Sequence, residues 1–327
     1  MRCSIVIPVY GNAGSISELF ARLDGMARDL PHPMEVMFVV DGSPDDSQAR
    51  IEAEAARGRF LARVAVHSRN FGSFAAIRTG LGLADGPYFA VMSADLQEPA
   101  EWAVGVFRML ARDACDVVLG VREGRADPLA TRLASSLFWR LYRYFVQPEM
   151  PAGGVDMFGC NAVVRDALLA LGEQRSSLVG QLMWIGFRRA ELSYPRLARR
   201  HDQSGWSLRR KLNYMADSVF AFTDLPIRLL QAVGGLGLVV CAVAALVVLG
   251  FRLAGRVPVL GYTPIVLAIL FSTFLILLGI GVLGGYLSRA FENSKCRPLA
   301  LVARVRAYPA AGHTPAGSPD LRGENPA

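Results

Sequence analysis

The chain has 327 residues, of which 52% are hydrophobic, and its 35 Lys and Arg against 28 Asp and Glu give a net charge of +7. This length allows one large domain or two smaller ones, and the apolar fraction is high for a soluble protein. The five cysteines show no metal-binding or disulfide spacing, which excludes a disulfide-rich scaffold and is typical of a reducing cytoplasm. The opening residues, MRCSIVIPVYGN, suit a first strand better than a signal peptide.

Apolar, strand-like runs alternate with amphipathic, helix-like runs over the first third of the chain. We expect strands at 4–9, 35–40, 62–68, 88–92 and 117–121, with helices at 15–29, 45–57, 73–84 and 101–112. This order predicts an α/β fold with a mostly parallel, doubly wound sheet. In such a sheet, ligands bind at the carboxyl ends of the strands.

Two long segments, 229–251 and 257–288, carry no charged residue. A hydrocarbon core of about 30 Å can be crossed by a helix of this length, whereas a buried core helix is usually shorter. We therefore expect two transmembrane helices. Lys and Arg gather before the first and after the second, so the positive-inside rule places the globular domain and the C-terminus in the cytoplasm, with the chain multi-pass in the inner membrane. The same residues suit anionic lipid headgroups better than nucleic acid.

The chain is thus expected to divide into five parts. These are a globular domain at 1–207, amphipathic interface helices at 208–228, two transmembrane helices at 229–288, a basic cytoplasmic segment at 289–306, and a Pro/Gly/Ala-rich disordered tail at 307–327.

Polar residues interrupt the chain directly after the apolar run at 88–92, in the sequence SADLQEP. Asp95 and Gln97 are two residues apart, so both can face one point on an extended strand tip. A carboxylate and an amide oxygen suit Mg²⁺ or Mn²⁺. The alternative is that Asp95 caps the helix that starts near Pro99.

Asp41 ends the second predicted strand in the sequence VVDGSPDDS. An acid at this place can accept hydrogen bonds from a ribose or a base edge. The alternative is a simple turn, since Asp-Gly is a strong turn signal.

Six segments occur in the order and spacing of one family: SIVIPVYGN, VVDGSPDDS, SRNFGSFAAIRTGL, SADLQEP, GGVDMFGCN and RRHDQSGWSLRRKLNY. Over about residues 4–305, the chain resembles the membrane-anchored family 2 glycosyltransferases with the GT-A fold. The similarity is to the polyprenyl-phosphate branch, which includes dolichol-phosphate mannose synthase-like enzymes. This resemblance implies a nucleotide-sugar donor, a divalent metal ion and a polyprenyl phosphate acceptor. The family includes homotetramers, so a homo-oligomer is compatible with it.

The resemblance also implies roles for individual residues. Asp95, Asp156 and Arg199 match the catalytic positions, and Asp95 with Gln97 matches the metal- and diphosphate-binding tip. The implied substrate-binding residues are Pro8, Tyr10, Asp41, Arg69, Arg122, Arg200, Ser204 and Lys211. The juxtamembrane arginines also have a purely structural interpretation, as contacts of lipid headgroups.

Three positions depart from the family pattern. Val40 and Ser93 stand where the family often has acids, and Asp202 stands where a glycine is usual. Ser93 removes one metal ligand, and Asp202 adds a negative charge to a phosphate-binding loop. Nothing in the sequence explains Asp202.

The resemblance implies inverting transfer of a hexose-type sugar, with uridine favoured over guanosine as the base, to undecaprenyl phosphate at the cytoplasmic face. An inactive membrane scaffold of the same fold is the first alternative, since Ser93 and Val40 depart from the pattern. A processive polysaccharide synthase is the second, although its Gln-x-x-Arg-Trp signature is not found. A glycosidase, which needs paired carboxylates and no anchor, explains none of these features.

Overall fold

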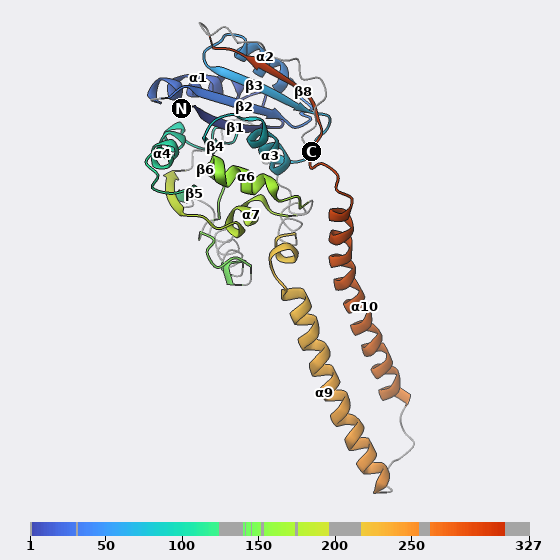
Figure 1. Ribbon diagram of the computed structural model, residues 1–327. Coiled ribbons are helices and arrows are strands. Elements are labelled where there is room, and N and C mark those ends of the chain that lie inside the picture. The colour runs from blue at the N-terminus through green and yellow to red at the C-terminus, as the bar shows by residue number, and fades with distance from the viewer. Residues whose placement is uncertain are drawn as a thin grey trace.

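A computed structural model of the protein describes residues 2–30, 32–123, 140, 142–144, 146–151, 154–173, 176–195, 217–254 and 262–310. At its centre is an eight-stranded sheet in the order β7-β5-β6-β4-β1-β2-β3-β8 (Figure 1). The strands are β1 (Cys3–Val9), β2 (Met34–Val40), β3 (Leu61–His67), β4 (Tyr88–Val91), β5 (Val117–Glu123), β6 (Met157–Asn161), β7 (Arg189–Pro195) and β8 (Val302–Tyr308). The helices of the domain are α1 (Ile16–Asp29), α2 (Ser47–Ala55), α3 (Ser73–Leu83), α4 (Ala100–Ala111), α6 (Ala162–Ala170) and α7 (Leu178–Trp184).

The predicted parallel, doubly wound sheet is confirmed. Strands β4, β1, β2 and β3 are neighbours and all run parallel. Successive side chains of β1 enter opposite cores, because side chains alternate along a strand. Ile5 and Ile7 pack in one core with residues of α1 and α4, while Val6 packs in the other with residues of α3, α6 and α7.

Three strands were not predicted from the sequence. β6 is antiparallel to both β4 and β5 and separates them, β7 is parallel to β5, and β8 is antiparallel to β3. β6 has only five residues and contains Gly159, so its pattern is weak. The glycine is required by packing, because a Cβ there would lie 2.1 Å from Val106 Cγ1 and 2.9 Å from Phe89 O.

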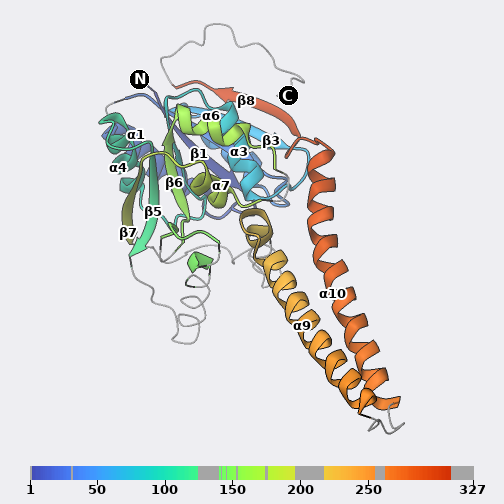
Figure 2. The same ribbon diagram turned by 60° about the horizontal axis from the view of Figure 1, so that its bottom comes forward.

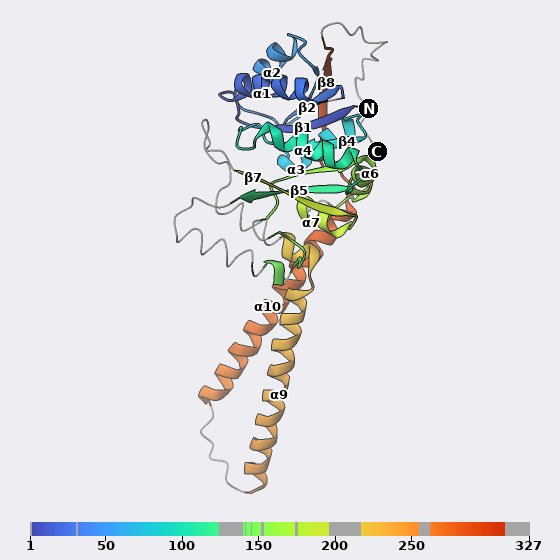
Figure 3. The same cartoon turned by 90° about the vertical axis from the view of Figure 1, so that its left-hand side faces the viewer.

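The two apolar segments form helices α9 (Leu225–Leu253) and α10 (Tyr262–Ser294), which leave the same end of the domain and point away from it (Figures 1 and 3). Both are long and apolar enough to cross a membrane, and none of the candidate span is buried. They are therefore not core helices: Leu246 is 69% exposed and Leu287 is 72% exposed. Of the predicted interface segment at 208–228, residues 217–228 are described: residues 217–222 are helical, and α9 already begins at Leu225.

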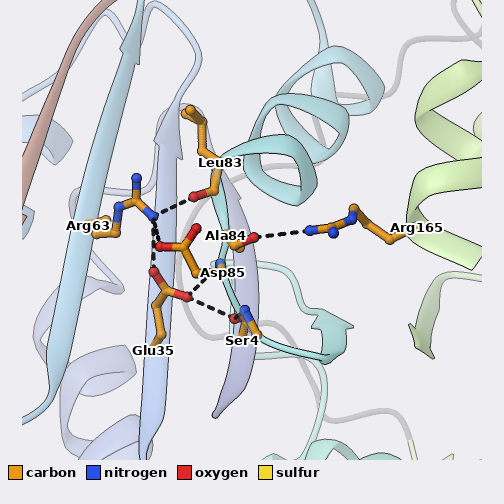
Figure 4. Close-up of polar contacts among 8 residues, drawn as sticks. Ser4, Glu35, Arg63, Leu83, Ala84, Asp85 and Arg165 are labelled. Atoms are coloured by element: carbon orange, nitrogen blue, oxygen red, sulfur yellow. Dashed lines mark hydrogen bonds and ion pairs between the residues drawn. The ribbon is translucent and has the colours of Figure 1, made fainter. Parts of the chain in front are cut away.

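The chain returns from α10 to the central sheet, where β8 lies along β3 (Figure 2). At the amino ends of the parallel strands, Glu35 is fully buried. Its carboxylate accepts hydrogen bonds from Ser4 Oγ at 2.8 Å and from Asp85 N at 3.1 Å (Figure 4). Arg63 Nη1 completes this network at 3.2 Å from Glu35 Oε1. The network satisfies the buried charge of Glu35 and fixes the turn between α3 and β4, at the end of the sheet away from the carboxyl ends of the strands.

Candidate active site

A cavity of about 760 Å³ opens at the carboxyl ends of the parallel strands. Five of the residues predicted from the sequence line it: Pro8 and Tyr10 from the end of β1, Asp41 after β2, Arg69 after β3, and Asp95 after β4. The strands are parallel, so residues far apart in the sequence reach one edge of the sheet. Gln97, Arg122 and Asp156 do not line this cavity.

Asp41 is 2% exposed, and both oxygens of its carboxylate accept hydrogen bonds. Oδ1 accepts from His67 Nδ1 and from Phe71 N, both at 2.8 Å, and Oδ2 accepts from Gly72 N at 2.7 Å. Burial on its own raises the pKa of Asp41, but these three hydrogen bonds outweigh it, and the pKa lies below its ordinary value. Asp41 therefore holds the loop that follows β3 in addition to lining the cavity.

The loop after β1 is held by the loop after β2. Gly11 N donates to Ser43 Oγ at 2.8 Å, Asn12 N donates to Ser47 Oγ at 3.0 Å, and Ala13 N donates to Asp45 Oδ2 at 3.0 Å. Burial opposes ionisation of Asp45, but hydrogen bonds from these loops prevail and lower its pKa to about 2. These contacts fix the backbone beside Tyr10, which is 47% exposed at the cavity wall.

The loop after β4 brings a serine and two carboxyl groups together. Ser93 Oγ lies 2.5 Å from Asp95 Oδ1 and also contacts Glu98 Oε2. Burial raises the pKa of Glu98 to about 7, and the charges of Asp95 and Asp156 add to this shift. The serine hydroxyl has one proton for two carboxyl groups, so the second contact is favourable when Glu98 carries a proton.

Leu96, between the two predicted metal ligands, has a φ of +63°. A residue other than glycine in this region is strained by about 1–3 kcal/mol, and such strain clusters at functional sites. Leu96 is 5% exposed, and its carbonyl accepts a hydrogen bond from Arg22 Nη1 at 3.2 Å. Packing of the leucine side chain into the core thus holds the backbone of the loop in its conformation.

Arg122 and Asp156 form an ion pair next to this loop. The Tyr194 hydroxyl donates to Asp156 Oδ2 at 3.1 Å, and Tyr194 packs edge-on against Trp102. Burial raises the pKa of Tyr194, and Asp156 and Glu98 raise it further, so the phenol stays protonated. The side chains of β5 and β7 therefore hold Asp156, which directly precedes β6, in one orientation.

Four predicted residues that precede the apolar helices lie outside the described residues, as does Asp202: Arg199, Arg200, Ser204 and Lys211. Arg69 is described: its guanidinium lies 4.0 Å from the centre of the Phe71 ring and donates to Asn70 O.

Four residues of the site were missed in the sequence: His67, Arg78, Glu98 and Tyr194. Arg78 lines the cavity, is 9% exposed, and donates to the carbonyl oxygens of Leu168, Leu169 and Leu171 at the end of α6. Glu98 directly follows Gln97 within SADLQEP, which is a signal that sequence reasoning had available. The other three are placed only by contacts between distant segments.

The side chains after β4 fit a divalent cation in their chemistry, because Ser93, Asp95, Gln97 and Glu98 offer only oxygen ligands of the hard type. Within the described residues, no three His, Cys, Asp or Glu side chains are grouped so that they would hold a metal ion. An ion at this loop would therefore take further ligands from a bound phosphate and water.

Residues 4–171 match the family model described as glycosyl transferase family 2. The undecaprenyl-phosphate 4-deoxy-4-formamido-L-arabinose transferase of Pseudomonas paraeruginosa is 35% identical over 320 residues, which cover 94% of this chain and 91% of that protein. An uncharacterized glycosyltransferase of Synechocystis, sll0501, is 29% identical over 92% of this chain and 94% of that protein.

Among solved structures, glucosyl-3-phosphoglycerate synthase from Mycobacterium tuberculosis, in complex with Mn²⁺, uridine diphosphate and phosphoglyceric acid, has a TM-score of 0.47 and 15% identity over 67% of this chain and 76% of that chain. The family match covers the loops after β1, β2, β3 and β4 and the cavity-lining residues that lie on them. The chain therefore belongs to glycosyl transferase family 2 and is a glycosyltransferase of the GT-A type with two apolar C-terminal helices.

Proposed function

We propose that the enzyme transfers a sugar from a nucleoside diphosphate sugar to a polyprenyl phosphate, such as undecaprenyl phosphate, at the membrane surface. One observation carries the proposal: the chain that forms the sheet and its cavity continues into two exposed apolar helices. The match to the Pseudomonas transferase, whose name specifies undecaprenyl phosphate, spans both parts. A membrane anchor would keep the transfer site close to an acceptor whose lipid chain lies in the bilayer.

The proposed donor site is the cavity. Pro8 and Tyr10 line the part assigned to the nucleobase, and Asp41 acts on the donor chiefly by holding the backbone amides of Phe71 and Gly72. Arg69 supplies a positive charge to the same wall. Uridine is the base we propose, with guanosine as the alternative.

Asp95 and Gln97 are the residues that would hold Mg²⁺ or Mn²⁺ beside the diphosphate. The ion would neutralise the charge that develops on the leaving diphosphate. Ser93 holds the Asp95 carboxylate beside the cavity, since its Oγ contacts Asp95 Oδ1, and the same oxygen also contacts Glu98. Ser93 thus has a supporting role where the family often has a second acid.

A polyprenyl phosphate is its own nucleophile, because a phosphate monoester carries about −1.5 to −2 charges at pH 7. One of its oxygens forms a bond to the anomeric carbon while the bond from that carbon to the diphosphate oxygen breaks. Attack opposite the leaving group inverts the configuration. No general base is needed, which agrees with an orienting role for Asp156, whose oxygens already accept from Arg122 and Tyr194.

The acceptor phosphate is proposed to bind near the bilayer, where Arg199, Arg200, Ser204 and Lys211 occur in the sequence. Arg122 is proposed to complete the positive charge on the side of the donor sugar. Basic residues on both flanks of the helix pair support a cytoplasmic location for this surface.

The test is a donor screen on the purified protein in detergent, with and without undecaprenyl phosphate. Nucleoside diphosphate release would be followed with Mg²⁺, Mn²⁺ or EDTA. We expect release with one donor that depends on the lipid and is lost in EDTA and in the Asp95→Ala variant. Asp24→Ala is the matched control, because Asp24 pairs with Arg28 on the solvent side of α1. Release that is independent of the lipid, or no turnover with any donor, would contradict the proposal.

A further inference from the structure

The loop formed by residues 68–72, called the donor loop below, forms much of one wall of the cavity. Asp41 holds one end of the loop through Phe71 N and Gly72 N. The middle packs on Gly42, where a Cβ would lie 2.5 Å from Arg69 C and from Asn70 N. These attachments come from the end of β2, within the same half of the sheet.

The third attachment comes from a part of the chain that follows both apolar helices in the sequence. Ser68 N donates a hydrogen bond to Leu301 O at 2.9 Å, and Leu299 lines the cavity. Both residues belong to the short segment that connects α10 to β8. The start of the donor loop is therefore held by residues that follow α10 in the sequence.

β8 is fixed to the domain by two kinds of contact. It pairs with β3 from Ala62↔Tyr308 to His67↔Val302, with an irregularity between Val66 and His67. Arg304 and Arg306 also form ion pairs with Glu52 of α2, at 2.8 Å and 3.0 Å. Irregularities of this kind re-aim side chains beside active sites. His67, at the irregularity, is the residue whose ring contacts Asp41.

We propose that the segment 299–308 positions the donor loop and thereby sets the affinity of the enzyme for its nucleotide. The inference rests on the proposed donor site in this cavity. Its physical basis is that a loop held at both ends loses less conformational freedom when a ligand binds, so its ordering costs less of the binding free energy. Releasing β8 would leave the attachments from β2 in place and free only the Ser68 end.

The test uses the full-length protein in detergent and the charge reversal R304E/R306E, which places two acids opposite Glu52. Neither arginine belongs to the proposed catalytic or donor-binding residues. The triple variant E52R/R304E/R306E restores opposite charges and is the matched control. Hydrogen exchange would report on residues 68–72 and 302–308, and calorimetric titration with uridine diphosphate and Mg²⁺ would report on affinity.

We expect R304E/R306E to lose exchange protection in both segments and to raise the Kd for uridine diphosphate about 5- to 20-fold. The value of kcat at saturating donor would change less than the KM, and the triple variant would recover most of the affinity. Loss of protection at 302–308 with unchanged protection and affinity at the donor loop would overturn the inference.

A failure of the proposed function looks different. In that case the unmodified protein would bind neither uridine nor guanosine diphosphate, which would reject the donor site directly. The exchange measurement would then still decide whether the segment 299–308 positions the loop, because coupled loss of protection in the two segments supports positioning and independent behaviour rejects it.

Discussion

Position 93 shows how one side chain shapes the loop after β4. A hydroxyl there contacts both Asp95 and Glu98, whereas a second carboxylate would add a further negative charge to a group in which burial already raises the pKa of Glu98 to about 7. The serine therefore replaces a charge by a hydrogen bond. The acid nearest the cavity is still held at its wall, so the loop keeps its proposed role.

Replacing Ser93 tests this supporting role. We expect Ser93→Ala to lower kcat/KM about 10-fold and to raise the Mg²⁺ concentration needed for half-maximal activity, because groups that orient a metal ligand typically contribute this much. Ser93→Thr keeps the hydroxyl and is the matched control. Steady-state rates across a metal titration measure both quantities, and an unchanged metal requirement in the alanine variant would reject the role.

Asp41 is the second residue whose role the contacts define. Asp41→Asn keeps the volume but points an NH₂ group at one of the donors that the carboxylate now satisfies, His67, Phe71 or Gly72. A donor left unsatisfied in a buried place costs about 1–3 kcal/mol. We expect a lower melting temperature together with weaker binding of nucleotide. Thermal unfolding in detergent and calorimetric titration would check this, and weaker binding at an unchanged melting temperature would instead indicate direct contact with the nucleoside alone.

At the scale of elements, the loop after β1 depends on the ionised form of Asp45. Its pKa is lowered to about 2 in the folded protein, against about 4 in an unfolded chain. A lowered pKa means that the stabilisation is complete above about pH 4 and is lost as the pH falls towards 2. We expect the melting temperature of the unmodified protein to fall more steeply over this range than that of Asp45→Asn. Equal slopes in the two proteins would show that the carboxylate does not hold the loop.

Arg78 links three elements, since it reaches from α3 to the carbonyl oxygens at the end of α6 and to Gln181 Oε1 of α7 at 3.0 Å. Arg78→Met keeps the apolar stem but leaves these acceptors without their donor, so we expect a loss of roughly 1–3 kcal/mol in the free energy of unfolding. The exposed Arg108→Met on α4 is the comparison variant and should change stability by no more than about 0.5 kcal/mol. Denaturant unfolding measures both, and equal effects would contradict a special role for Arg78.

The sequence predicts those elements whose pattern is local. The strands β1 to β4 are apolar runs that alternate with amphipathic helices, and α9 and α10 contain long uncharged runs. The pattern does not predict β6, which is short, or β8, which alternates only partly between half-buried and exposed positions at the edge of the sheet. Their pairing is decided by distant partners.

The same distinction applies to the site. Asp41 and Asp95 are predicted because they directly follow apolar strands. His67 and Tyr194 acquire their contacts only when the sheet forms, because their partners Asp41 and Asp156 come from other strands. The contacts of Asp41 also add a role that its sequence position does not indicate, that of holding the donor loop.

At the scale of the whole molecule, the sheet fixes the path of the chain relative to the helix pair. β8 pairs with β3, so the chain before α9 and the chain after α10 meet on the same side. If both helices cross the bilayer, they form a hairpin with the catalytic domain and residue 308 on one face. The positive-inside rule, applied to the charges beside the helices, predicts that this face is the cytoplasmic one.

Reporter fusions after residue 310 test this orientation. We expect a fused green fluorescent protein to be fluorescent and a fused alkaline phosphatase to be inactive in bacteria, because the first folds in the cytoplasm and the second requires an oxidising compartment. Fusions within the loop between α9 and α10 should give the opposite result and serve as the control. An active phosphatase after residue 310 would contradict the orientation.

The position of β8 in the sheet also determines when the sheet can be completed during synthesis of the protein. Residues 302–308 leave the ribosome after both apolar helices, yet their partner strand β3 is synthesised before either of them. Until then, β3 has an uncovered edge, and such edges invite pairing with other chains. The nascent enzyme therefore completes its sheet only after the helices have been released for insertion. If insertion of the helices into the membrane were delayed, the domain would remain without β8 for longer and would be more prone to aggregate.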